Sequence, residues 1–366
     1  MMNRRGFVTK AAAGSAAAAA ATFAAPAIGQ GKQEWRMVTA WPKGLPGLGT
    51  GADLLAKRIS TMSGGRLTVR VFSAGELVPG LQTFEAVQSG TAEMGHDTPG
   101  FHLGKHRAFA YFFGPPFGMA YQEHVAWLYH GGGQALWDEL SAQFGLKSFA
   151  IGSIGTPSFG WFKKELKAAS DLKGVKMRMP GLGTEMIRRL GAVPTLMAPG
   201  DLFPALQAGT LDATDFTGPA NDMALGFHQV CKYLYFPAVQ KPGAVQQVII
   251  NKKKFDALPN DLKEIVTVAC EAAHQNMLAE YNWINAKALP ALQSHGVKLL
   301  TLPHDLLEAL GNVAGEILFE ERDKLDPLGK KIWEAYFGAR TGQMSLSTIG
   351  DREFFNARIM KIKYPG

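Results

Sequence analysis

Residues 84–95 read FEAVQSGTAEMG and residues 203–214 read FPALQAGTLDAT, so one twelve-residue phrase occurs twice. Each copy has the pattern of a helix that ends at a glycine and is followed by a short strand. The copies start 119 residues apart, which is typical of a domain and too long for a solenoid repeat. The duplication predicts two similar α/β lobes, a plan often used to enclose a small ligand. The alternative is that helix, glycine and strand follow one another in many α/β proteins. The recurring positions are Phe84/Phe203, Ala86/Ala205, Gln88/Gln207, Gly90/Gly209 and Thr91/Thr210.

Strand and helix patterns alternate along most of the chain. Such alternation implies a mostly parallel sheet flanked by helices in each lobe. A long helical pattern from Pro259 to about Leu289 fits a helix that connects both lobes. We expect one lobe to hold residues 30–152 and 243–282, and the other to hold residues 153–242 and 283–366 with a helical tail. The predicted strands are 35–40, 67–72, 93–96, 147–154, 176–179, 213–216 and 245–251.

The N-terminus has the pattern of an export signal. Residues 4–10 read RRGFVTK, a twin-arginine motif, and an alanine-rich run over residues 11–25 follows it. Small residues allow cleavage near residues 27–29. We therefore interpret residues 1–29 as a twin-arginine signal peptide that directs the folded protein to the periplasm. The alternative is an alanine-rich membrane helix, which Gly14, Ser15 and Thr22 disfavour.

The charge of the chain is modestly positive. The formal net charge is +7, and because the signal carries three basic residues and no acid, +4 remains for the mature part. Basic residues are not interleaved with stacking aromatics, so nucleic acid is not expected as a partner. The two cysteines, Cys231 and Cys270, do not make a disulfide framework. We expect buried thiols, with a bridge as the alternative in an oxidising compartment.

No catalytic motif stands out. Residues 47–52 match the GxGxxA dinucleotide fingerprint, but residues 41–46 with two prolines intervene after the strand, and no acid ends the strand at 67–72. Neither a nucleophile triad nor a pair of catalytic carboxylates is recognisable. We therefore predict a binding protein without a cofactor. The alternative is an exported cofactor-dependent oxidoreductase, a class that the twin-arginine pathway often serves.

Four segments together resemble a known family. They are FSAGELVPG at 72–80, KMR at 176–178, GDLFPAL at 200–206 and DATDF at 212–216. They are similar to the DctP-type solute-binding proteins of TRAP transporters, in particular the branch that binds 2-oxo acids such as pyruvate. The resemblance runs from the signal to the tail at 330–333. It implies a two-lobed periplasmic binding protein of type II-like fold that closes on a small organic acid and delivers it to TRAP membrane subunits.

The resemblance assigns a carboxylate-binding role to Arg178, within KMR. A planar guanidinium at the end of a strand can hold a carboxylate through two hydrogen bonds. The alternative for this residue is an ordinary surface arginine.

The sequence departs from the family where the branch binds a metal cation next to the ligand. There a Gln, a Glu-Trp pair and a second Glu hold the metal, and these positions fall on Pro157, Asp215-Phe216 and Lys241. We therefore expect no metal, because two ligands are lost and an ammonium would repel the ion. Lys241, paired with Asp215, would place its own charge there. With Arg178 the site then carries a net +1, which suits a monocarboxylate. The alternative is an alignment shifted by one residue, with Lys241 in solvent.

Aromatic residues at matching positions are candidate walls of the pocket. They suit a ligand with an apolar or aromatic tail. The alternative for each is packing in the core. The candidates are Trp41, Phe101, His102, Phe159 and Phe216.

Aromatic residues also cluster on the helical tail, at Trp333, Tyr336 and Phe337. The branch includes homodimers that exchange a C-terminal helix, and exposed aromatics on this tail would fit such an interface. The alternative is that they cap the second lobe.

Overall fold

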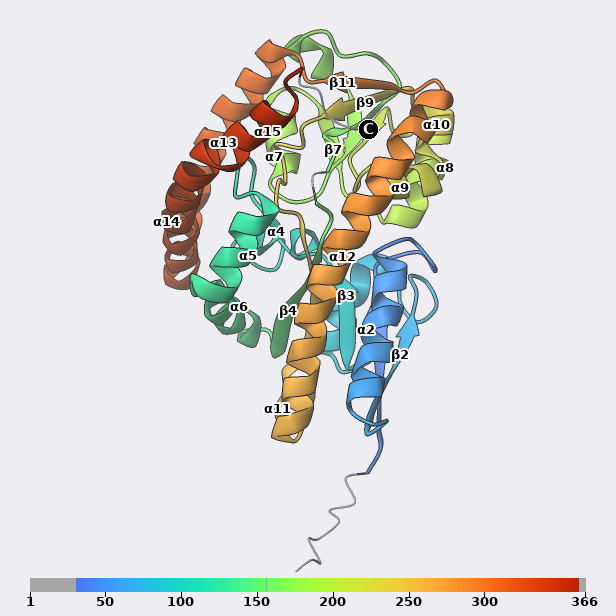
Figure 1. Cartoon of the computed structure of the whole chain (residues 1–366), viewed down its shortest axis with the longest axis vertical. Coiled ribbons are helices and arrows are strands. Elements are labelled where there is room, and N and C mark those ends of the chain that lie inside the picture. The colour runs from blue at the N-terminus through green and yellow to red at the C-terminus, as the bar shows by residue number, and fades with distance from the viewer. Residues whose placement is uncertain (1–30, 156, 362–366) are drawn as a thin grey trace, which may run out of the picture. The chain divides into compact units, whose positions relative to one another are not determined.

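The computed structural model describes residues 31–155 and 157–361, so the predicted signal peptide lies outside the described residues. The described residues from Glu34 onward belong to one compact unit (Figure 1). In the described part of the chain, no helix combines the length and apolar character that crossing a membrane requires. Cys231 and Cys270 are both buried and unbridged, as predicted.

Two mixed sheets organise the chain, and their strand orders correspond. The first sheet has the order β2-β1-β3-β10-β4, and the second has the order β7-β6-β8-β5-β9-β11. In both, the second and third strands pair in parallel, and an antiparallel strand, β10 or β5, follows the third. The predicted α/β architecture is confirmed, and each sheet is mixed because it contains this antiparallel strand. The strands are β1 (Gln33–Thr39), β2 (Leu67–Phe72), β3 (Met94–Asp97), β4 (Leu146–Ser153), β5 (Gly160–Phe162), β6 (Lys176–Arg178), β7 (Val193–Thr195), β8 (Ala213–Thr214), β9 (Tyr233–Phe236), β10 (Val245–Asn251) and β11 (Lys298–Thr301).

The repeated phrase occupies corresponding positions in the two sheets. Its helices are α3 (Thr83–Gln88) and α8 (Leu202–Gln207). Gly90 and Gly209 follow them with φ of 81° and 78°, a left-handed conformation that glycine adopts without steric cost. The strands that follow, β3 and β8, are the third strands of their sheets. The duplication inferred from the two phrases is therefore present in the topology.

The long helix α12 (Asn260–Ser294) contacts elements of both halves of the chain (Figure 1). It packs against β4 and α2 (Gly49–Met62), which belong to the first sheet and its cover, and against α9 (Pro219–Ala224), which follows β8. The helix continues for one turn beyond the predicted end because Pro290 is accommodated within it. Its buried residues recur every three or four positions, as an amphipathic helix requires: Leu262, Val266, Ala269, Cys270, Ala273, Met277, Leu278 and Tyr281.

The glycines of the dinucleotide-like segment serve this packing. A Cβ at Gly47 would lie 2.5 Å from the ring of Tyr281, and one at Gly51 would lie 3.1 Å from Met277. Both contacts are with α12. The glycines thus allow α2 and the loop before it to approach the long helix closely, which explains their spacing without a nucleotide.

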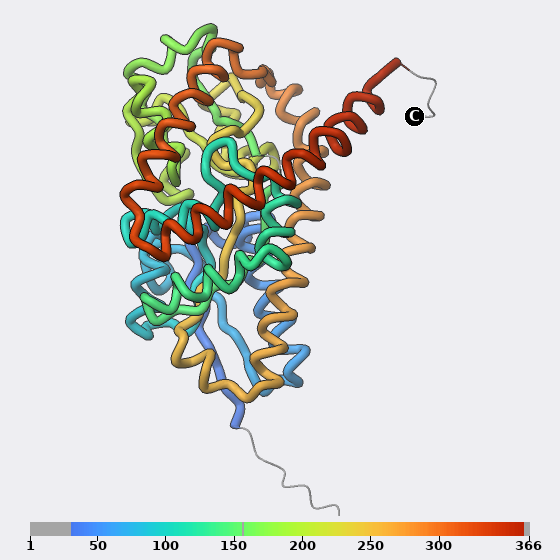
Figure 2. Tube along the Cα trace, turned by 90° about the vertical axis from the view of Figure 1, so that its left-hand side faces the viewer, coloured from blue at the N-terminus to red at the C-terminus, as the bar shows by residue number. Residues whose placement is uncertain are grey.

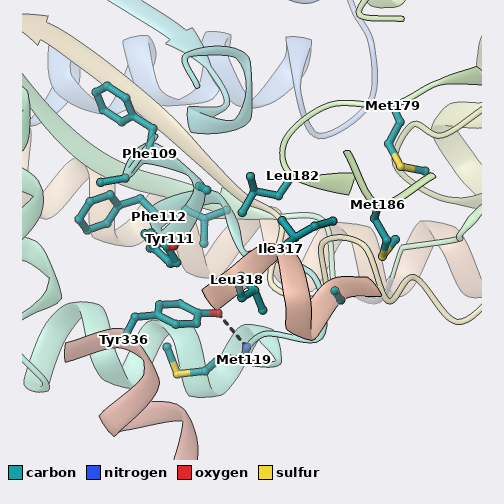
Figure 3. Packing of buried hydrophobic residues seen from close by; sticks show 14 of the residues in the cluster. Phe109, Tyr111, Phe112, Met119, Met179, Leu182, Met186, Ile317, Leu318 and Tyr336 are labelled. Atoms are coloured by element: carbon teal, nitrogen blue, oxygen red, sulfur yellow. Dashed lines mark hydrogen bonds between the residues drawn. The ribbon is translucent and has the colours of Figure 1, made fainter. Parts of the chain in front are cut away.

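The aromatic residues of the tail are packed against the core. Tyr336 on α14 (Pro327–Ile349) is fully buried, and its hydroxyl oxygen accepts a hydrogen bond of 2.8 Å from the backbone of Met119. Figure 3 shows it below Phe112 and Tyr111, with Leu318 of α13 (His304–Lys324) close by. Trp333 and Phe337 are partly buried against the same cluster. The expectation that these aromatics are exposed is wrong, because α14 packs against the helices that follow β3.

The C-terminal helical segment, unlike the buried part of α14, exposes apolar side chains. The last turns of α14 and the helix α15 (Asp351–Arg358) extend away from the rest of the unit (Figure 2). Large apolar side chains there are more than half exposed: Leu346, Ile349, Phe354, Phe355, Ile359 and Met360. The remaining helices are α4 (Phe109–Phe113), α5 (Tyr121–His130), α6 (Gly133–Ala142), α7 (Gly183–Arg189), α10 (Phe227–Val230), α11 (Lys252–Asp256) and the short 3-10 helices η1 (Gly80–Gln82), η2 (Pro99–Phe101), η3 (Ala169–Leu172) and η4 (Pro199–Asp201).

Candidate ligand-binding site

A small cavity lies where strand ends of the two sheets meet. Its volume is about 20 Å³, room for about one water molecule, so side chains fill most of the space. Residues at or just beyond the ends of β1, β3, β4, β6, β8 and β10 contribute to it. In α/β folds the ends of adjacent strands are the usual place for ligands. The lining residues are Trp41, Leu48, Thr98, Phe101, Phe113, Ile154, Arg178, Pro180, Phe216, Thr217, Lys241 and Gln246.

Arg178 is the last residue of β6 and is 1% exposed. Its Nε donates to the carbonyl of Met197 at 3.2 Å, and its Nη1 donates to the carbonyl of Asp215 at 2.8 Å. The rings of Phe101 and Phe216 each lie 5.9 Å from the guanidinium carbon. Nη2 has no hydrogen-bond partner among the described residues. Backbone carbonyls therefore orient the guanidinium, while one donor group remains for a ligand.

Burial lowers the pKa of Arg178 to about 10, because desolvation penalises the charged form. Asp215 and Asp222 oppose this shift. The pKa remains well above neutral pH, so the guanidinium is a buried cation. A buried cation that has only backbone carbonyls as hydrogen-bond partners favours an anionic ligand.

Lys241 and Asp215 form a buried ion pair beside Arg178. The ammonium nitrogen lies 2.8 Å from Oδ1 of Asp215, and the two side chains are 3% and 0% exposed. The ammonium also donates to the carbonyl of Phe216. Although the charges are in contact, neither carboxylate oxygen accepts a well-directed hydrogen bond from the described residues. Burial raises the pKa of Asp215 and lowers that of Lys241, and the attraction between the two charges opposes both shifts.

The structure brings six of the eight predicted site residues together. Trp41, Phe101, Arg178, Phe216 and Lys241 line the cavity, and Asp215 lies directly behind them in contact with Lys241.

The other two predicted residues, His102 and Phe159, do not line this cavity. The imidazole Nε2 of His102 lies 2.8 Å from Oδ2 of Asp97, and its ring packs against Phe84 with centroids 4.7 Å apart. Phe159 is fully buried and stacks on Phe162. The position of His102 follows from the 3-10 helix η2. Phe101 is its last residue and His102 comes directly after it, so the two side chains point in different directions.

Several lining residues were not predicted from the sequence. Gln246 is the most polar of them, at 3% exposure, and it lies near the start of β10, between Val245 and Gln247. The sequence feature that could have indicated this site residue is the pair of consecutive glutamines in the otherwise apolar stretch VQQVII. The apolar lining residues Leu48, Phe113 and Ile154 carried no signal, since they resemble any other core residue.

The residues around the cavity do not fit a metal cation. Lys241 places an ammonium at the cavity, and Asp215 already pairs with it. Pro157 lines a different cavity and has no side-chain donor atom. Within residues 31–155 and 157–361, no three His, Cys, Asp or Glu side chains form a group able to hold a metal ion. A cation placed here would face two positive charges with one carboxylate.

Comparison with known proteins shows similarity to bacterial extracellular solute-binding proteins. Residues 38–322 match the model of the bacterial extracellular solute-binding protein family 7, named DctP. A monocarboxylate 2-oxoacid-binding periplasmic protein from Nostoc sp. is 38% identical over 322 residues, which cover 88% of each chain.

Two solved structures also resemble the chain. A TRAP transporter solute-binding protein from Bordetella bronchiseptica is 32% identical, with a TM-score of 0.87 over 89% of this chain and 97% of that one. It is a mixed-occupancy dimer with a calcium- and picolinate-bound site and an apo site. A TRAP periplasmic solute-binding protein from Pseudoalteromonas atlantica, with bound sodium and pyruvate, is 35% identical, with a TM-score of 0.86 over 89% of this chain and 99% of that one.

Proposed function

The chain belongs to family 7 of the bacterial extracellular solute-binding proteins, and from this membership we propose that it is the receptor of a TRAP transporter for a small organic monocarboxylate with a 2-oxo or 2-hydroxy group. The observation that carries the proposal is the buried guanidinium of Arg178, a residue that lines the cavity; two backbone carbonyls hold it, and its Nη2 has no hydrogen-bond partner among the described residues. Relatives that bind 2-oxo acids, picolinate or pyruvate support the ligand class.

The charge of the site agrees with a monoacid. Arg178 and Lys241 contribute two positive charges and Asp215 one negative charge, so these three groups carry one net positive charge, while burial raises the pKa of the nearby Asp222 to about 7. A dicarboxylate would bring a second charge that no cation in the cavity neutralises, and desolvating it would be costly. The aromatic residues Trp41, Phe101 and Phe216 form walls suited to an apolar substituent.

Lys241 would stand in place of the metal ion that accompanies the organic acid in the solved relatives. Those proteins contain calcium or sodium together with the organic acid. In this chain an ammonium stands at the cavity instead, held by Asp215 and the carbonyl of Phe216. A covalently attached cation would make ligand binding independent of dissolved metal ions.

The proposal includes the place and partners of the receptor. The two lobes would centre on the two sheets and close around the acid, which the receptor then delivers to TRAP membrane subunits. Export to the periplasm would follow the twin-arginine motif at residues 4–10, outside the described residues. The exposed apolar end of α14 and α15 would support a homodimer, the assembly state of the Bordetella bronchiseptica relative.

The oxidoreductase alternative is not favoured. Members of this family are solute receptors rather than enzymes. The glycines that suggested a dinucleotide instead pack against α12.

A binding screen tests the proposal. Thermal unfolding of the mature protein should be raised by monocarboxylates with a 2-oxo or 2-hydroxy group, and calorimetry should give a stoichiometry of one. Dicarboxylates of matched length should raise the unfolding temperature less. Absence of any stabilisation across the organic acids would contradict the assignment.

A further inference from the structure

Two buried polar atoms at the cavity have no hydrogen-bond partner in the described part of the chain. They are Oε1 of Gln246 and Nε1 of Trp41, whose side chains are 3% and 2% exposed. Both residues line the cavity that also contains Arg178 and Lys241. An unpaired polar atom in a buried site costs free energy until a ligand or water satisfies it. The two atoms therefore describe what a ligand must supply: one donor and one acceptor.

The orientation of the Gln246 amide is determined by its own hydrogen bond. Its Nε2 donates to the carbonyl oxygen of Ala244 at 3.0 Å. Turning the amide over would place two acceptors at that distance, which is repulsive. Oε1 is therefore the atom left without a partner. The adjacent Gln247 is satisfied differently, by donating to Oδ1 of Asp97 at 2.7 Å, and the strand register shifts between the two glutamines.

On the basis of the proposed function, we propose that Gln246 makes this receptor select a 2-hydroxy acid over the corresponding 2-oxo acid. A hydroxyl group can donate to Oε1 of Gln246 and can accept from Nε1 of Trp41. A keto oxygen only accepts, so it leaves the glutamine carbonyl buried and unpaired. Because the cavity is small, the group on the carbon next to the carboxylate is the part of the ligand within reach of these side chains.

The charges at the cavity exclude the other common donor at this carbon. A 2-amino group would be an ammonium at neutral pH and would face Arg178 and Lys241, two buried cations at the same cavity. A neutral hydroxyl group donates a hydrogen bond without this repulsion. The donor that Gln246 requires is therefore a hydroxyl.

Matched pairs of acids test this selectivity. Calorimetry would compare pyruvate with both enantiomers of lactate, 2-oxobutyrate with 2-hydroxybutyrate, and phenylpyruvate with phenyllactate. The wild-type protein should bind one enantiomer of the hydroxy acid about tenfold or more tightly than its oxo partner, since an unpaired buried acceptor costs about one factor of ten. In Gln246→Met and Gln246→Leu the two acids of a pair should bind within about threefold of each other, because the acceptor is gone.

Gln240 provides a matched control. It is also buried with an unpaired Oε1, but it does not line the cavity and donates to the carbonyls of Ser158 and Phe159. Because its amide also lowers the pKa of Asp215, the control compares the preference ratio and not the affinity itself. Gln240→Met should keep the wild-type preference, whatever its effect on stability.

Equal affinities for the two acids, or a preference for the oxo acid in the wild type, would overturn the inference while leaving the receptor function intact. A preference that persists in both Gln246 variants would also overturn it. If neither acid of any pair binds, the proposed function itself fails. The preference ratio does not depend on the fraction of folded protein, so reduced stability of a variant does not obscure the result.

Discussion

The ammonium of Lys241 lies 2.8 Å from a carboxylate oxygen of Asp215, and both side chains are almost completely buried at the cavity. Breaking such a pair by removing one partner leaves an uncompensated buried charge. Loss of either partner would therefore destabilise the site, and loss or reversal of the lysine charge would also change the net charge that a ligand meets.

We predict that ligand affinity is independent of metal ions. Dialysis into sodium-free buffer with a chelator should leave the affinity unchanged, because Lys241 supplies the charge. Lys241→Glu should weaken binding strongly, since the net charge of the site changes from +1 to −1 opposite an anion. Lys253→Glu, at an exposed residue of α11, makes the same charge change far from the cavity and should leave affinity near the wild-type value. A stoichiometric metal in the ligand-bound wild type, found by elemental analysis, would refute the replacement.

Arg178→Ala should abolish carboxylate binding. Loss of a buried charged partner costs about 2–5 kcal/mol, so affinity should fall by a factor between about 30 and several thousand. Arg178→Lys should rescue little, because an ammonium cannot reproduce the two bonds to Met197 and Asp215 and still donate to the ligand as a guanidinium does. Arg188→Ala, on the exposed side of α7, is the control. Calorimetric affinity of Arg178→Ala within about threefold of wild type would contradict the assignment.

The end of the chain should mediate dimerisation. Phe354 and Phe355 on α15 are 61% and 53% exposed, and burying such rings against a second copy would stabilise a dimer. The wild-type protein should sediment as a dimer at micromolar concentration, and the double variant Phe354→Asp/Phe355→Asp as a monomer. Phe319→Asp changes an equally exposed phenylalanine on α13 and should leave the dimer intact. A wild-type monomer, or a dimer that survives the double substitution, would argue against this interface.

The protein should lose stability as the pH falls below about 6.5, partly through His274. Burial lowers the pKa of this histidine from 6.5 to about 4. The unfolded chain takes up a proton through pH 6.5 and the folded chain does not until about pH 4, so the free energy of unfolding falls with pH in this window. One such proton contributes a slope of up to about 1.4 kcal/mol per pH unit.

Urea unfolding at several pH values would measure this slope. His274→Gln removes the titration while keeping a group that can bond to the hydroxyl of Tyr129, which lies 3.3 Å from the imidazole Nδ1. The variant should therefore show a flatter dependence of stability on pH. His130→Gln, at an exposed position, serves as control. Parallel profiles for wild type and His274→Gln would show that His274 does not contribute.

Local patterns were sufficient to identify most elements of the sheets and helices. The repeated phrase predicted two corresponding helix-to-strand turns, and Gly90 and Gly209 adopt the left-handed conformation that such turns need. The strands predicted at 67–72 and 245–251 agree with β2 and β10. Periodicity succeeds here because it depends on which face of an element is buried. The strands β5, β7, β9 and β11, of three or four residues each, were not predicted, since so few residues show little periodicity; β8 is as short, but the repeated phrase predicted it.

The family motif KMR and its context identified Arg178, and the departures from the family at Asp215 and Lys241 indicated a charge pair that the structure contains. Only the tertiary structure decided which neighbours face the cavity. Phe101 lines it while His102 turns to Asp97, and Tyr336 is buried although its helix comes late in the chain. Gln246 was recognised as a candidate ligand-binding residue only because the structure places it at the cavity. Where a side chain points beyond a strand end depends on the elements packed around that turn, and these are distant in the sequence.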